Sequence, residues 1–286
     1  MNLKLTALRL SVLSVLSVLA VLAALCALSA PAWAIDCSKA QTPSEKLICS
    51  SKSLQKADSR LNKTYAATLK AAPDEEIRTM LVASQKRWIA ARDKALEGII
   101  EDSTPDDKSA TQVANDMIAE RTAQLEEKGR TSLIEVARKQ QTFLKQFSGG
   151  DYAGYETSCD MLPPDQTYNC FPTRHYQNDD RVCSVEEYWA TNTGYTKRFI
   201  ADIVDGKPKL IASCSFNGDD NTCPTTSGEG RSWNVKPEAQ SALYSSKPEL
   251  KLDGEVNDSD DYDWLKTCLT DKSFPVADPT RSGVAE

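Results

Sequence analysis

The distribution of its cysteines limits what this chain can fold into more than any other feature. Cys37 and Cys49 stand together, and the next cysteine, Cys159, follows about a hundred residues later. Because these two flank one short segment and have no nearer partner, we expect a disulfide between Cys37 and Cys49. Its loop of about a dozen residues would make it worth roughly 3 kcal/mol by chain entropy.

Six more cysteines crowd into the second half of the chain: Cys159, Cys170, Cys183, Cys214, Cys223 and Cys268. The ninth cysteine of the chain, Cys26, lies in the N-terminal apolar run over 10–28. None of the other eight forms a Cys-x-x-Cys pair, the spacing that metal and redox sites use. An even number in an exported chain therefore indicates four disulfides. If Cys37 joins Cys49, the other six allow 15 pairings, among which the sequence does not choose. Their position predicts a second, separately cross-linked domain.

Residues 1–34 have the pattern of a secretory signal. Lys4 and Arg9 flank an apolar run over 10–28, and the tripeptide Ala-Trp-Ala that ends at Ala34 fits a cleavage site. We expect cleavage after Ala34 and a periplasmic or secreted protein without stable membrane insertion. The alternative is an uncleaved membrane anchor, because the apolar run is long for a signal.

The charge balance bears on the kind of partner. The chain has 34 basic and 41 acidic side chains, and the leader carries only Lys4 and Arg9, so the mature chain keeps 32 against 41, a net charge of −9. Nucleic acids and anionic membranes need clustered Lys and Arg, and are not expected as partners. The balance favours a cationic partner, although solubility alone also explains an acidic secreted protein.

Capping signals start the first helix. Thr42 can accept a hydrogen bond from the amide of Glu45, and Glu45 can reach back to the amide of Thr42, which makes a capping box. Pro43 suits the first helical position. We therefore expect a short helix that begins after Thr42 and ends near Cys49.

Two long helices are predicted next. Apolar residues spaced by three and four indicate a helix of about eighteen residues from Leu54, ended by Pro73, and a second helix over about 77–95. We expect the two to pack antiparallel across a short turn. Helical rise then places Asp58 near enough to Arg92 for an ion pair.

This part of the chain resembles the N-terminal domain of the LprI-type lysozyme inhibitors, a family of secreted bacterial proteins. The resemblance covers about residues 37–93 and reaches 127 if a helix with Arg121 and Leu125 is included. It implies an all-helical module and an ability to bind and inhibit lysozyme. Family members often have a cysteine just after the residues that correspond to Arg92 and Asp93, whereas this chain has Lys94. The family's second disulfide is therefore expected to be missing. The residues that carry the resemblance are Cys37, Thr42, Pro43, Glu45, Cys49, Asp58, Tyr65, Gln85, Trp88, Arg92 and Asp93.

Tyr65 and Trp88 allow two interpretations. Aromatic residues at helical spacing usually pack between helices, and we expect both in the core of the module. Contact with a ligand is the alternative.

The fold class expected for the whole chain is α+β, an all-helical antiparallel bundle followed by a disulfide-stapled, β-rich domain. The domains expected are a signal peptide over 1–34, an LprI-like helical domain over 35–130, a helix and boundary over 131–150, a β-containing domain over 151–275 and a disordered tail over 276–286.

The clearest β signal is a hairpin over residues 195–216. Asp205 and Gly206 form a two-residue turn, which places Asp202 opposite Lys209. Counting outward from the turn also puts Phe199 on one face with Ile203, Ala201, Leu210, Ala212 and Cys214. Pro208 suits a strand at a sheet margin, because it has no amide to donate.

The chain offers little for catalysis. His175 is the only histidine, and it is expected on a surface loop, because Pro and Asn surround it. The acidic segment over 253–263 is expected to be a solvated loop, since it lacks the spacing of a calcium loop. We therefore expect no enzyme, no cofactor and no metal site.

The function expected is that of an exported bacterial binding protein that inhibits a cationic lysozyme by occluding its cleft. The alternative is a structural or interaction protein of the cell envelope without inhibitory activity. Exposed carboxylates at the ends of the second long helix are the candidates for contact with such a partner, namely Asp74, Glu75, Glu76, Glu101 and Asp102.

Overall fold

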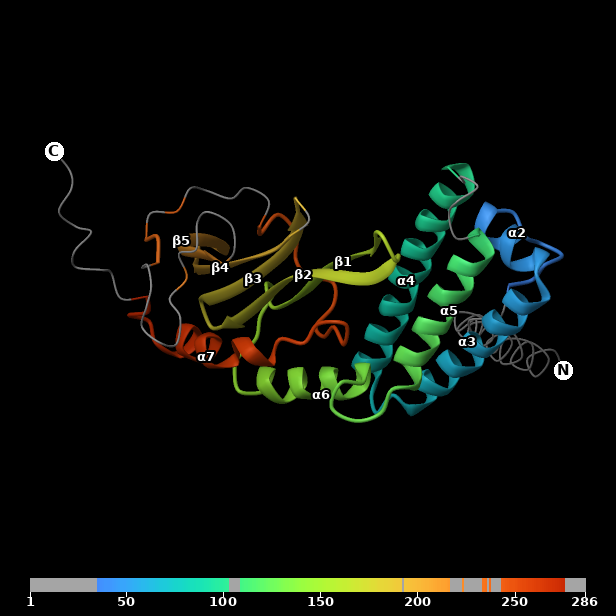
Figure 1. Ribbon diagram of the computed structural model, residues 1–286. Helices are drawn as coiled ribbons and strands as arrows, with labels where there is room; N and C mark the ends of the chain where they lie inside the picture. The colour runs from blue at the N-terminus through green and yellow to red at the C-terminus, as the bar shows by residue number, and fades with distance from the viewer. Residues whose placement is uncertain are drawn as a thin grey trace, which may run out of the picture.

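The computed structural model describes residues 35–102, 109–191, 193–216, 223, 233–235, 237 and 243–275. The expected signal peptide and the expected C-terminal tail lie outside the described residues. The chain is an α+β protein in which helices come first and a five-stranded antiparallel sheet follows (Figure 1). None of the described helices has both the length and the apolarity needed to cross a membrane.

Four of the five described helices in the first half start at hydroxyl caps, and the fifth starts at the carboxylate of Asp74, which accepts from the amide of Ile77. The side chains of Thr42, Ser51, Ser109 and Ser132 each accept a hydrogen bond from an amide three residues ahead, which satisfies donors that a first turn leaves without partners. The helices are α2 (Pro43–Ser50), α3 (Lys52–Ala71), α4 (Glu75–Asp102), α5 (Ala110–Glu126) and α6 (Leu133–Leu144).

The predicted pairing of the two long helices is only partly right. Residues 72–74 join α3 to α4 as expected, but α5 lies between them and takes most of the packing surface of α3 (Figure 1). The expected ion pair between Asp58 and Arg92 is not formed. Asp58 accepts a hydrogen bond from the main-chain nitrogen of Ile35 at 3.0 Å, and Arg92 binds its neighbour Asp93 at 2.7 Å.

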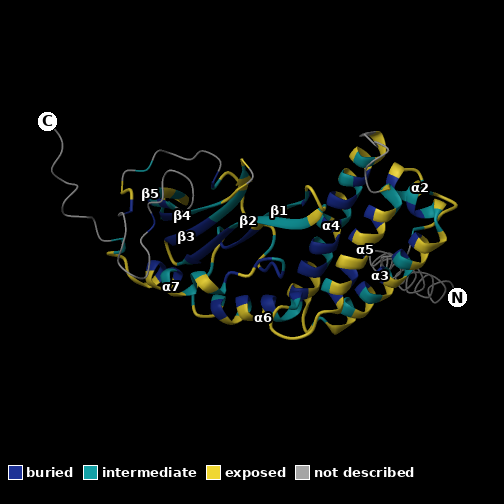
Figure 2. Ribbon diagram, viewed as in Figure 1, coloured by how far each residue is buried: buried dark blue, intermediate teal, exposed yellow. Residues whose placement is uncertain are grey.

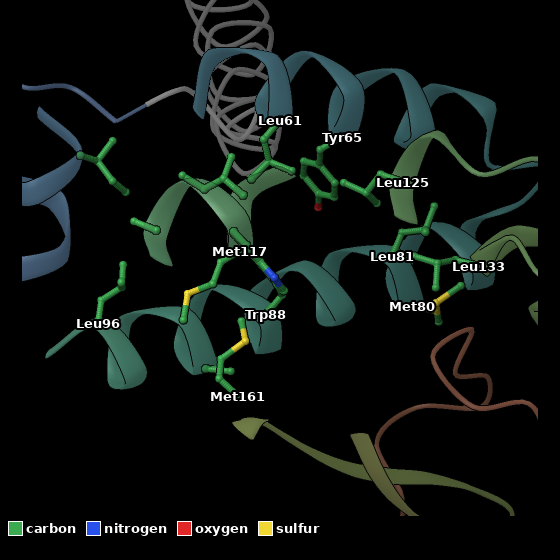
Figure 3. Packing of buried hydrophobic residues seen from close by; sticks show 14 of the residues in the cluster. Leu61, Tyr65, Met80, Leu81, Trp88, Leu96, Met117, Leu125, Leu133 and Met161 are labelled. Carbon is green, nitrogen blue, oxygen red and sulfur yellow. The ribbon is translucent and has the colours of Figure 1, made fainter. Parts of the chain in front are cut away.

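The helical core is built from aliphatic, methionine and aromatic side chains. Trp88 of α4 lies near its centre, close to Met117 of α5 (Figure 3). Met161 of the sheet and Leu252 belong to the same cluster of buried residues. The first core is therefore closed by residues from the second half of the chain.

The sheet is a meander, with its strands side by side in chain order. The turn between the last two strands has positive φ at Asp205 (52°) and Gly206 (75°), the conformation that matches the natural twist of a hairpin. Asp202 pairs with Lys209 as predicted. The strands are β1 (Gly154–Leu162), β2 (Thr167–Asn178), β3 (Arg181–Ala190), β4 (Thr193–Val204) and β5 (Lys207–Phe216).

A bulge changes the rest of that hairpin. Ile200 pairs with Ala212 and the next residue pairs with Leu210, so Ile211 is an extra residue in β5. An extra residue moves every later pair to the other face. Phe199 therefore does not share a face with Ala212 and Cys214, and this part of the predicted register is wrong.

Both faces of the sheet are covered (Figure 2). One face packs against α7 (Tyr262–Thr270), which follows a 3-10 turn, η1 (Ser259–Asp261), and is linked to β3 by the Cys183–Cys268 disulfide. The other face carries His175 and Phe199 and packs against Tyr244.

Each edge strand of the sheet pairs with a short segment beyond it. The amide of Tyr155 in β1 donates to the carbonyl of Leu250 at 2.8 Å, and Ser213 of β5 exchanges two main-chain hydrogen bonds with Asn234. Pro208 lies at the start of β5, an edge strand, where its missing amide costs no ladder bond.

The eight cysteines from Cys37 to Cys268 all form disulfides. The predicted Cys37–Cys49 bridge is present, with 5.4 Å between its Cα atoms. The three bridges that the sequence left open are Cys159–Cys170, Cys183–Cys268 and Cys214–Cys223.

Helix α6 contributes to both cores. Leu133 and Ala137 belong to the helical cluster, whereas Phe143 stacks on Tyr262 in the cluster under the sheet, with ring centroids 3.9 Å apart. The two halves of the molecule are thus packed together along one continuous helix (Figure 1).

Candidate functional site

The residues that start the family pattern build the entry to α2. The hydroxyl of Thr42 accepts from the amide of Glu45 at 3.2 Å, and the Glu45 carboxylate accepts from the amides of Gln41 and Thr42 at 2.7 and 3.1 Å. These amide bonds hold the pKa of Glu45 below its usual value. Thr42, Pro43 and Glu45 therefore fix a helix end, which Cys37–Cys49 ties to the preceding chain.

The two aromatic residues of the pattern are buried. Trp88 is 1% exposed and Tyr65 is 4% exposed, and both lie inside the helical cluster (Figure 3). The guanidinium carbon of Arg92 lies 5.2 Å from the Trp88 ring centroid, within the range of a cation–π contact. A partner protein could not reach either ring without opening the bundle.

Behind Trp88 lies a buried polar cluster centred on Arg121 of α5. Its guanidinium donates to Gln85 at 3.0 Å, to Ser84 at 2.7 Å and to Glu255 at 2.8 Å. The side chains of Arg121 and Glu255 are 0% and 3% exposed. Glu255 also accepts from Ser84 and from Gln124. Both members of this buried ion pair have further hydrogen-bond partners. Removing one member would leave the other charge buried and unpaired, which strongly destabilises the folded protein.

Asp253, two residues before Glu255, forms a second pair with Arg87 of α4. The nitrogen–oxygen distance is 2.7 Å, and the Asp253 side chain is fully buried. Burial raises the pKa of Asp253, and the nearby Arg87 opposes that rise. Between the two acids stands Gly254, where an added Cβ would lie 2.4 Å from the carbonyl oxygen of Leu133. No larger residue fits there without moving α6.

The side-chain amide of Gln140 in α6 fastens the same loop. Its nitrogen donates to the carbonyls of Asp253 and Val256, both at 2.9 Å, and its oxygen accepts from the amide of Asp253 at 2.9 Å. We call residues 252–256 the acidic loop. Helices α4, α5 and α6 each bind it, so the acidic loop joins the second half of the chain to the helical module.

The expectation of a solvated acidic segment over 253–263 is therefore wrong. Besides the acidic loop, Asp258 is 2% exposed and accepts hydrogen bonds from Tyr155, Tyr176 and Tyr262. Asp261 binds Arg174 and Arg198. Asp258 and Asp261 are withdrawn from solvent because cations and hydroxyls on the sheet face supply their partners, whereas Asp260 and Asp263 of the same segment are exposed.

The expectation for His175 is also wrong. It lies in β2, not in a loop, and is 2% exposed. Its Nδ1 shares a hydrogen bond of 2.7 Å with the Ser184 hydroxyl, which lies 3.0 Å from the Tyr244 hydroxyl. Burial lowers the pKa of His175 to about 4. The side chain is neutral at pH 7 and out of reach of a substrate.

The acidic residues proposed for partner contact occupy opposite ends of α4. Asp74, Glu75 and Glu76 stand at its start, and Glu101 and Asp102 at its end. A helix of this length spans about 40 Å, so one small contact patch cannot include both groups. Asp74, Glu75, Glu76 and Glu101 are all exposed, and Asp74 and Glu76 also accept hydrogen bonds from Gln141 of α6. The side chain of Asp102 is outside the described residues.

A groove of about 750 Å³ lies beside the start of α4. The second half of α3 and the turn from α5 to α6 form its walls, and Pro73 reaches its border. Its lining combines apolar residues such as Leu125 and Ile134 with charges of both signs, namely Glu126, Glu127, Glu135, Lys128 and Arg138. Arg60 binds Glu126 and Arg138 binds Glu135, so the groove offers an apolar surface beside charges that are largely paired.

No arrangement for catalysis is evident in the described part of the chain. None of its groups of His, Cys, Asp and Glu could hold a metal ion. The sequence pattern pointed to Gln85 and Trp88 but missed Asp253, Glu255 and Gln140. Nothing local marks these three, because their partners lie more than a hundred residues away in sequence.

Comparison with known proteins agrees with the helical module. Residues 37–125 match the family model described as lysozyme inhibitor LprI. No curated protein and no solved structure matches the chain. The match ends at the last turn of α5, so α6 and the sheet lie outside it. Over helices α2 to α5 this chain is therefore similar to the LprI family.

Proposed function

We propose that the protein is an exported, non-enzymatic binding protein that inhibits a cationic lysozyme-type glycosidase. The LprI match over residues 37–125 is the observation that carries this proposal. Four disulfides suit an oxidising compartment such as the periplasm or the cell exterior. The acidic excess of the chain would speed the encounter with a basic enzyme.

Because several residues of the family pattern are buried, fewer residues of the helical module remain as candidates for contact with the partner. Trp88 and Gln85 are internal, so recognition must use groups on the outside of the bundle. The start of α4 and the adjoining groove combine exposed carboxylates with an apolar surface. We assign the contact to this end of the helical module, and not to Glu101 at the other end.

Inhibition is tested by mixing the mature protein with lysozymes of different types at equimolar ratio and following the clearing of a cell-wall suspension. We expect clearing to slow, and the association rate to fall steeply as salt is raised past the point where the Debye length is about 10 Å. Absence of both inhibition and salt-sensitive binding with every lysozyme would rule the proposal out.

Matched charge variants test the assigned surface. Glu75→Gln with Glu76→Gln should slow association several-fold and leave stability nearly unchanged, because exposed charges contribute little to folding. Glu97→Gln with Glu101→Gln removes the same number of exposed charges near the other end of α4 and should have a smaller effect. If both sets of substitutions slowed association equally, the rate would depend on the overall charge of the protein and not on the assigned surface.

One observation favours the alternative of a cell-envelope interaction protein without inhibitory activity. The acidic loop covers one side of the LprI-like helical domain, so that side cannot meet an external partner. If inhibition requires the side of the domain that the acidic loop covers, the intact chain would not inhibit lysozyme. Binding without inhibition in the clearing assay would support this alternative.

A further inference from the structure

Asp58 of α3 is a buried acid without a cationic side chain beside it. It is 4% exposed, and its carboxylate accepts a hydrogen bond from the main-chain nitrogen of Ile35 at 3.0 Å. Arg92, the cation expected there, is held by Asp93. Within the described residues, no Lys, Arg or His forms an ion pair with Asp58.

Such an arrangement is costly in an unprocessed chain. Burying a carboxylate is unfavourable unless a charge and hydrogen bonds compensate it. In the precursor, the nitrogen of Ile35 belongs to a neutral peptide bond and supplies one hydrogen bond only. Two other buried acids have cationic partners, Arg87 for Asp253 and Arg121 for Glu255. A third, Asp258, accepts hydrogen bonds from three tyrosine hydroxyls, more than the single side-chain bond described for Asp58.

We propose that removal of the leader supplies the missing charge. A signal peptidase would hydrolyse the bond between Ala34 and Ile35, consuming one water and leaving a carboxylate on Ala34 and an amine on Ile35. The amine takes up a proton at neutral pH, since α-amino groups have pKa values of about 7.7–8.0. The new ammonium group, at the position of the present nitrogen, forms a buried ion pair with Asp58.

The surrounding structure holds that nitrogen in place. Ile35 lies two residues before Cys37, whose disulfide to Cys49 fixes the chain to α2. The Ile35 side chain packs against the helical core. The N-terminal segment therefore loses little conformational entropy when the ion pair forms, and this makes the pair stronger.

The pair makes the helical module respond to processing. Before cleavage, Asp58 has a neutral donor, and the packing of α3 on the N-terminal segment is weaker. After cleavage, an ammonium group with three donors locks the segment onto α3. The inference rests on the proposed export and cleavage, and it is independent of lysozyme inhibition.

The test uses the full mature chain, Ile35 to Glu286, with its N-terminal amine free or acetylated. We expect acetylation to lower the Tm of the parent protein by about 5 °C or more, a typical response to losing one such interaction. In the Asp58→Asn variant, acetylation should have almost no effect, because the carboxylate that pairs with the amine is already gone.

The matched control is Asp36→Asn, because Asp36 is exposed and pairs with Lys39. This variant should keep the full effect of acetylation. If acetylation lowers the Tm of the parent and of Asp58→Asn equally, the effect does not pass through Asp58 and the proposal is overturned. An unchanged Tm on acetylation of the parent overturns it as well.

Two further measurements need no substitution. Mass spectrometry of the exported protein should show Ile35 as its first residue, and any other N-terminus overturns the proposal. The α-amine of the folded chain should react with an acylating reagent at least tenfold more slowly than that of a short peptide with the same first residues. Equal rates would also overturn it. Failure to inhibit lysozyme would affect neither result.

Discussion

The helical part and the sheet part of this molecule are stabilised in different ways. One disulfide, Cys37–Cys49, lies in the helical part, whose core cluster consists of aliphatic, methionine and aromatic residues. The sheet part has three disulfides, and buried polar side chains such as Arg174, His175 and Asp258 lie among its apolar residues. Both parts bury polar side chains, among them Arg121 and Gln85 in the helical part, so internal polar groups do not distinguish them. The helical part has the larger cluster of buried apolar residues, whereas the sheet cluster includes four disulfide cysteines. We therefore expect the sheet part to depend more on its covalent links.

Removing one disulfide from each part tests this comparison most strongly. The Cys183–Cys268 bridge spans 85 residues and the Cys37–Cys49 bridge spans 12. Loop entropy predicts a loss of about 4.5 kcal/mol for replacing the first pair by alanine and about 3 kcal/mol for the second. Urea unfolding of the two double variants measures both losses. A larger loss at Cys37–Cys49 would contradict the view that the sheet depends more on its bridges.

Tryptophan truncation tests the apolar core of the helical part. Trp88→Ala should cost about 3–5 kcal/mol, because it removes a large side chain from the closed interior. Trp189→Ala in the sheet part is the control, since Trp189 is 45% exposed and should cost under about 0.5 kcal/mol. Unfolding followed by circular dichroism gives both values. A small effect at Trp88 would mean that the bundle does not rely on this core.

Acid should weaken the sheet part through His175. Burial lowers the folded pKa to about 4, whereas the unfolded chain has the usual histidine value of about 6.5. Between these values the unfolded state binds the extra proton, so stability falls as pH falls from about 6.5 to 4, by about 3 kcal/mol in all. Above about pH 6.5 this group contributes no pH dependence.

The variant His175→Gln isolates that contribution. It keeps a polar side chain beside Ser184 but does not titrate, so its stability should change less between about pH 6.5 and 4 than that of the parent. Urea melts at several pH values check this. Parallel pH profiles for parent and variant would assign the acid sensitivity to other groups.

The acidic loop tests whether the two parts unfold together. Glu255→Gln leaves the Arg121 guanidinium buried without its counter-charge, which should cost about 2 kcal/mol. It should also separate the unfolding of the two parts, seen as transitions that differ between helix and tryptophan probes. The control Glu249→Gln changes an exposed acid just before the same loop and should leave one shared transition.

Local signals in the sequence predicted the local features well. Each of these features depends on residues that are close together in the chain. They are the capping box at Thr42, the disulfide between Cys37 and Cys49 and the turn at Gly206. The hairpin register failed where Ile211 bulges, because a bulge has no reliable pattern in a single sequence.

Long-range partners explain the larger errors. His175 has a polar neighbourhood in sequence but lies in an inner strand of the sheet, and only the tertiary fold places Tyr244 over it. Asp253 and Glu255 read as surface acids until Arg87 and Arg121 are placed beside them. For the candidate site, the sequence therefore identified the helix-side residues, and the structure supplied the loop that completes the cluster.

The two short pairings at the margins of the sheet affect how readily one molecule can pair with another. A free strand edge offers unpaired amides and carbonyls to the next molecule and is a common starting point for aggregation. Here Leu250 pairs with one residue of β1 and Asn234 with one residue of β5, while Pro208 removes one more donor from β5. Each of these features takes main-chain groups away from an edge, so it interrupts the row of groups with which a neighbouring molecule could extend the sheet.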